Sequence, residues 1–181
     1  MHRRPIQSFR QYLLDRIVLR PSRHPIEHAP LTRVMLKSSG RPLECFTQKN
    51  YDGDQPPELL LLKFPGTAGR AERSTEFPLS ILGDVRGTLW TWNPPGYGRS
   101  GGRASLARIA DAAIDFWNQV QQREAAPSTS VWLCGNSLGC ATTLSVAAAI
   151  QPDPIKSGII LRNPPPLVPV VKRVAQRYPL A

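Results

Sequence analysis

Histidine, cysteine and long apolar runs are all scarce in this sequence of 181 residues. The three cysteines, Cys45, Cys134 and Cys140, are odd in number and widely spaced, which excludes a disulfide framework and a zinc site built only from cysteine. No apolar run approaches the roughly 18 residues that a membrane-spanning helix needs. The first five residues are basic and no apolar stretch follows them, so we expect no secretory signal and a reduced, cytoplasmic location.

Acidic residues are also in short supply, with 13 Asp and Glu against 23 Lys and Arg. The net charge of +10 lies at the two ends, because residues 1–33 and 154–181 each carry +5 and residues 34–153 are neutral. Aromatic residues do not alternate with the basic ones as a stacking surface for bases requires, so we expect no nucleic-acid partner. Solvated chain ends and peripheral contact with an anionic surface remain as the two interpretations.

The order of apolar segments predicts an α/β fold. From residue 58 onward, short apolar runs alternate with segments of helical periodicity, which is typical of a mostly parallel sheet with helices on both faces. We divide the chain into a basic N-terminal helix and linker at 1–30 and an α/β core at 31–181. The expected strands are 32–37, 42–48, 58–64, 87–92, 130–134 and 158–161, the first two forming an antiparallel hairpin, and the expected helices are 8–20, 71–82, 105–124, 140–150 and 168–176.

Residues 135–139, Gly-Asn-Ser-Leu-Gly, match the pattern G-x-S-x-G between an apolar strand and a helix. In this setting the turn is so tight that Gly135 and Gly139 leave no room for a side chain, and the Ser137 hydroxyl is pushed out above the sheet. Ser137 then lies at a helix N-terminus, where free N–H groups favour developing negative charge. We therefore predict Ser137 as a nucleophile and the backbone N–H of Leu138 as an oxyanion donor.

With this motif the chain resembles the α/β-hydrolase superfamily, over the N-terminal part of that fold. The segment 64–69 is similar to the oxyanion loop after the third strand, although Pro65 stands where many members have His. The segment 93–100 is similar to the D-x-P-G-x-G-x-S segment after the fourth strand, with Asn93 in place of Asp. The resemblance implies an incomplete α/β-hydrolase fold of the Bem46-like and serine-aminopeptidase-like branch, with the N–H of Thr67 as the second oxyanion donor.

Neither a histidine nor a suitably placed acid follows Ser137, although the family order is Ser, acid, His. Asp153 is the one acid after Ser137, and it lies between two prolines. The three histidines, His2, His24 and His28, all precede the first core strand. The sequence is therefore either a truncated form of a complete hydrolase or a natural short relative that has lost catalysis.

The expected function is hydrolysis of an ester, thioester or amide carbonyl in a small-molecule acyl substrate, with Ser137 as nucleophile. No cofactor or metal is expected, because no cluster of His, Cys, Asp or Glu has ligand spacing and no complete dinucleotide fingerprint occurs. The alternative is a catalytically inactive, hydrolase-like protein that binds an anionic partner through its basic ends.

Overall fold

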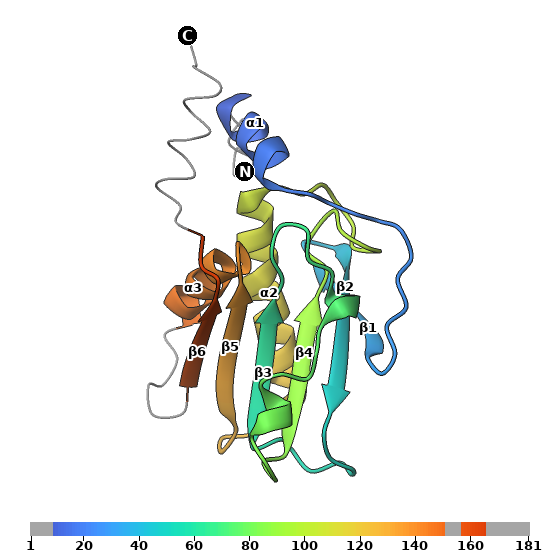
Figure 1. Ribbon diagram of the computed structural model, residues 1–181, viewed down its shortest axis with the longest axis vertical. Helices are drawn as coiled ribbons and strands as arrows, with labels where there is room; N and C mark the ends of the chain where they lie inside the picture. Colours follow the sequence, from blue (N-terminus) through green and yellow to red (C-terminus); the bar gives the residue numbers. More distant parts are fainter. Residues whose placement is uncertain (1–8, 151–156, 166–181) are drawn as a thin grey trace.

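Six strands form one mixed sheet in the computed structural model of the chain, which describes residues 9–150 and 157–165 (Figure 1). The strand order is β1-β2-β4-β3-β5-β6. The pairs β1–β2 and β2–β4 are antiparallel, whereas β3–β4, β3–β5 and β5–β6 are parallel, which confirms the predicted mostly parallel sheet. The strands are β1 Thr32–Ser38, β2 Arg41–Lys49, β3 Leu59–Phe64, β4 Gly87–Trp92, β5 Ser130–Asn136 and β6 Ser157–Arg162.

The predicted N-terminal hairpin is confirmed. Its two-residue turn consists of Ser39 and Gly40, whose φ angles are 47° and 73°. Positive φ at both turn positions matches the right-handed twist of the flanking strands, which is why such turns dominate two-residue hairpins.

The connections after β3 and β5 lead to opposite sides of the sheet. The connection after β3 leads to β4 on one side, whereas the connection after β5 leads to β6 on the other side. In open α/β sheets, diverging connections of this kind leave a crevice at the carboxyl ends of the two strands, where ligands bind. The loops after β3 and β5 therefore meet at the position that the fold favours for a site.

Two α-helices, α2 (Leu106–Glu124) and α3 (Gly139–Ile150), lie on one face of the sheet (Figure 1). The α2 helix confirms the helix expected at 105–124, and its N-cap is Ser105, whose hydroxyl accepts the N–H of Arg108 at 3.3 Å. Its apolar side packs on the strands, with the Phe116 ring stacked on Trp92 at a centroid distance of 5.5 Å. Alternate residues of β3, Leu60 and Leu62, complete this layer of the core.

The opposite face of the sheet is covered by two short 3-10 segments, η1 (Ala71–Arg73) and η2 (Leu79–Ile81). The predicted α-helix over 71–82 is therefore wrong. Pro78 has no backbone N–H and its ring clashes with the preceding turn, so a continuous α-helix cannot pass through it. The apolar residues of the segment are still buried, since Ala71 and Leu79 pack in one cluster with Leu59 and Leu61 of β3.

The N-terminal helix α1 (Phe9–Val18) lies beyond the carboxyl ends of the parallel strands, close to the start of α2 (Figure 1). Asp15, with 2% of its surface exposed, accepts the N–H of Leu106 at 2.9 Å and so binds α1 to the first turn of α2. The expected helix at 168–176 and the acid Asp153 lie outside the described residues. No helix in the described ranges has the length and apolar character needed to cross a membrane.

Replacing Asp15 with alanine should lower the free energy of unfolding by about 1–2 kcal/mol, because it leaves the partly buried N–H of Leu106 without this acceptor. Denaturant unfolding of Asp15→Ala measures this loss. Asp111→Ala is the matched control, since Asp111 is exposed on α2. Equal stabilities of the two variants would contradict the role of Asp15.

Candidate active site

The turn between β5 and α3 has the tight geometry that its glycines predict. Ser137 has a φ of 52°, in the left-handed region that side chains other than glycine rarely adopt. A Cβ on Gly135 would lie 2.6 Å from the Cα of Cys140, and one on Gly139 would lie 2.0 Å from the backbone oxygen of Phe64. Strand, turn, helix and the end of β3 are thus in backbone contact, which holds Ser137 in its strained conformation.

Ser137 faces the loop that follows β3. A Cβ on Gly66 would lie 3.1 Å from the Cβ of Ser137 and 3.7 Å from its Oγ. The Ser137 N–H donates to the backbone oxygen of Arg162 at 2.9 Å, which ties the turn to β6. Ser137 and Gly66 therefore lie on the two sides of the crevice that the strand order predicts.

The two residues whose backbone amides are predicted as oxyanion donors line one small cavity. Thr67 and Leu138 both line a cavity of about 10 Å³, a volume that holds at most one water molecule. Within the described residues, the structure gives neither the N–H of Thr67 nor that of Leu138 an acceptor. Ser137 does not line this cavity, but it contacts Gly66, which does.

The β3 loop is held in place by contacts that the sequence pattern does not indicate. The backbone oxygen of Thr67 accepts the hydroxyl of Tyr97 at 2.7 Å and the N–H of Arg20 at 3.2 Å. The Arg20 N–H also lies 3.2 Å from the Tyr97 hydroxyl. Leu19, the next residue toward α1, is 4% exposed and closes one side of the small cavity. The N-terminal segment therefore covers the site.

Both described histidines have their contacts elsewhere. His24 is exposed, and its Nδ1 lies 2.7 Å from the Ser22 hydroxyl. The His28 ring packs on Phe46 at 5.3 Å and its Nδ1 lies 2.8 Å from the backbone oxygen of Leu31. In the described part of the chain, no histidine or carboxylate hydrogen-bonds Ser137.

The cysteines next to the turn are not competing nucleophiles. Cys134 and Cys140 are both buried, and burial raises the pKa of each thiol above its ordinary value. A thiol reacts through its thiolate, so both are less reactive than an ordinary cysteine at neutral pH. Across residues 9–150 and 157–165, no group of three or more His, Cys, Asp or Glu is placed to hold a metal ion.

A buried polar cluster supports the loop after β4. The Asn93 amide nitrogen donates to Glu44 at 2.8 Å and to Glu72 at 2.9 Å, while its oxygen accepts the N–H of Ala71 at 2.9 Å. An aspartate at this position could not donate to two carboxylates, which explains why asparagine fits here. Arg70 pairs with Glu72, and both are buried.

These observations define the α/β-hydrolase fold, with a serine-bearing turn after β5 facing the loop after β3. Solved structures agree. The chain is similar to XC6422 from Xanthomonas campestris, an α/β serine hydrolase without a lid, with a TM-score of 0.56 and 19% identity over 80% of this chain and 64% of that one. It is similar to the esterase Pf2001 from Pyrococcus furiosus, with a TM-score of 0.63 and 12% identity over 89% of this chain and 61% of that one.

A thioesterase domain from the curacin biosynthetic pathway is also similar, with a TM-score of 0.50 and 16% identity over 67% of this chain and 40% of that one. Identities this low establish the fold alone. The chain thus spans less than two thirds of the length of each of these structures. No protein-family model matches the sequence, and no curated protein matches it. The Bem46-like branch stays a prediction.

The buried Glu72 should give the protein an acid-sensitive stability. Burial alone would raise the pKa of Glu72, but hydrogen bonds from Arg70 and Asn93 outweigh burial and lower this pKa below its ordinary value. Ionised Glu72 therefore stabilises the fold above the unfolded-state pKa of about 4.3, and this contribution is lost as the pH falls through the lower folded-state pKa.

We expect Glu72→Gln to be less stable than wild type at neutral pH and the difference to shrink as the pH falls below about 4. Denaturant unfolding at a series of pH values measures this convergence. Glu27→Gln is the control, because Glu27 is exposed, and it should follow the wild-type profile. A stability difference for Glu72→Gln that stays constant across this range would show that the carboxylate charge is not involved.

Proposed function

We propose that the chain carries the nucleophile and oxyanion site of a serine hydrolase that acts on an ester, thioester or amide. The observation that carries the proposal is the position of Ser137, strained at φ 52° and in contact with Gly66 of the neighbouring loop. Strain of this kind persists only where the surrounding structure enforces it, and it concentrates at functional sites. A fold shared with structures described as a serine hydrolase, an esterase and a thioesterase supports the same reading.

In this proposal the Ser137 oxygen attacks the substrate carbonyl carbon while its proton passes to a base. The carbonyl oxygen becomes an oxyanion, which accepts hydrogen bonds from the N–H groups of Thr67 and Leu138. Both groups lack a protein acceptor in the described residues, so the developing charge meets donors that need no rearrangement. Collapse of the intermediate expels the alcohol, thiol or amine with a proton, and water then hydrolyses the acyl-serine ester.

The base and the acid that orients it would come from outside the described residues. A serine hydroxyl without a base is a poor nucleophile, and loss of the histidine from a complete triad costs roughly 10⁶-fold in kcat. Turnover by the described site alone should therefore be weak. The alternative of an inactive binding protein gains no support from the solved structures named above, which are all described as hydrolytic enzymes.

A fluorophosphonate probe should phosphonylate Ser137 slowly and at one site, because the oxyanion donors stabilise the transition state even without the base. Intact-mass measurement followed by peptide mapping identifies the modified residue. Ser137→Ala should not be labelled. Ser145→Ala, which removes an exposed hydroxyl from the same α3 helix, should be labelled as wild type is.

The rate of labelling in the presence of added imidazole is a second test of the same site. If a base is what the described site lacks, imidazole should accelerate labelling of the wild type in proportion to its concentration and leave Ser137→Ala unlabelled. Labelling of Ser137→Ala at the wild-type rate, with or without imidazole, would exclude Ser137 as the nucleophile.

A further inference from the structure

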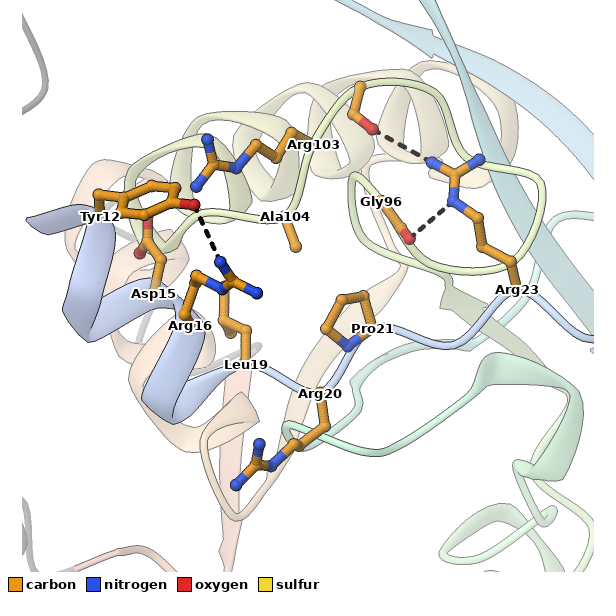
Figure 2. A pocket seen from close by; sticks show the side chains of 11 residues that line it. Tyr12, Asp15, Arg16, Leu19, Arg20, Pro21, Arg23, Gly96, Arg103 and Ala104 are labelled. Carbon is orange, nitrogen blue, oxygen red and sulfur yellow. Dashed lines mark hydrogen bonds between the residues drawn. The ribbon is translucent and has the colours of Figure 1, made fainter.

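An arginine-rich groove lies between α1 and the loop that follows β4 (Figure 2). Its volume is about 850 Å³, which is within the range of pockets that bind small molecules. Leu19 lines both this groove and the small cavity that Thr67 and Leu138 line, so the two are neighbours. The charged residues that line the groove are Asp15, Arg16, Arg20, Arg23 and Arg103.

Two of these arginines already have a structural role or point elsewhere. The Arg23 guanidinium donates to the backbone oxygens of Gly96, Ser100 and Gly102 at 3.1–3.3 Å, which uses its donors to hold the loop. The Arg20 side chain lies apart from the Tyr12 ring in Figure 2, below Leu19. Neither is therefore the group that would hold a ligand.

Arg16 and Arg103 are positioned differently, on the ring of Tyr12. The Arg103 guanidinium carbon lies 4.3 Å from the ring centroid and that of Arg16 lies 5.8 Å from it. Arg16 also donates to the Tyr12 hydroxyl at 3.1 Å. Stacking fixes the plane of the Arg103 guanidinium and leaves its edge donors available, whereas the hydrogen bond to the Tyr12 hydroxyl orients Arg16 and uses one of its donors.

No salt bridge in the described part of the chain involves Arg16 or Arg103. The one carboxylate in the groove, that of Asp15, is buried and accepts the N–H of Leu106. The groove therefore presents two guanidinium groups in a concave surface, and neither forms a salt bridge within the described residues. This arrangement suits an anion that accepts two parallel hydrogen bonds, as phosphate and carboxylate groups do.

We propose that the Tyr12–Arg16–Arg103 cluster binds a phosphate or carboxylate group carried by the acyl substrate. The assignment to the substrate rests on the proposed function, and the anion site itself does not. Leu19 lines both the groove and the small cavity at Thr67 and Leu138, so the two lie on either side of one side chain, and this observation links the anion site to the substrate. The concave site favours a small ligand over a flat membrane surface.

Calorimetric titration of the full chain with inorganic phosphate and with succinate tests the anion site without catalysis. Wild type and Ser137→Ala should bind at least one of the two probes saturably and with equal affinity. The double variant Arg16→Gln/Arg103→Gln should bind at least roughly tenfold more weakly, because charge-assisted hydrogen bonds are lost. Arg123→Gln, an exposed arginine at the far end of α2, is the control and should bind as wild type does.

Which probe binds distinguishes phosphate from carboxylate as the recognised group. No saturable binding of either probe, equal binding by the double variant, or binding only to phosphatidylglycerol vesicles would each overturn the proposal. Both arginines are exposed, so the double variant should melt as wild type does, and its melting temperature verifies that it is folded.

A competition experiment tests the assignment to the substrate. The probe that binds should slow fluorophosphonate labelling of Ser137 in wild type and leave labelling of the double variant unchanged. Binding that does not affect labelling would separate the groove from the substrate and overturn that assignment. Binding that survives while Ser137 is never labelled would instead contradict the proposed function and leave the anion site standing.

Discussion

Direct backbone contact between the β5–α3 turn and the loop after β3 is the constraint on which the site depends. The Cα of Gly139 packs so closely on the backbone of Phe64 that no Cβ fits, and a Cβ on Gly66 would make a tight contact of 3.1 Å with the Cβ of Ser137. Glycine at these positions brings two loops, about 70 residues apart in the sequence, to van der Waals distance. The same contact keeps Ser137 at a positive φ and brings Thr67 and Leu138 to the lining of one cavity.

The N-terminal segment packs against the loop after β3 and lines one side of the small cavity. Asp15 binds α1 to the start of α2, and the Arg20 N–H and the Tyr97 hydroxyl both bind the backbone oxygen of Thr67. The residues that immobilise the oxyanion loop therefore come from α1 and from the loop after β4. Arg16 of α1 and Arg20 and Arg23 of the segment after it line a groove next to the site, although the charge count alone leaves them either solvated or in contact with an anionic surface.

Local sequence signals predicted the parts of the fold that local physics determines. The α2 helix follows from the helical periodicity of its apolar residues, and the turn at Ser137 follows from two glycines between a strand and a helix. The helix predicted over 71–82 is wrong, because its apolar periodicity extends past Pro78, where a continuous α-helix cannot form. The bond from Leu106 to Asp15, the bond from Tyr97 to Thr67 and the groove at Tyr12 join residues that are far apart in sequence, so no local pattern contains them.

A crystal structure of the chain after reaction with the fluorophosphonate probe tests the central claim most directly. We expect phosphorus bonded to the Ser137 Oγ, with the phosphonyl oxygen about 3 Å from the backbone nitrogens of both Thr67 and Leu138. A phosphonyl oxygen turned toward solvent, with either N–H bonded to a protein carbonyl instead, would contradict the account.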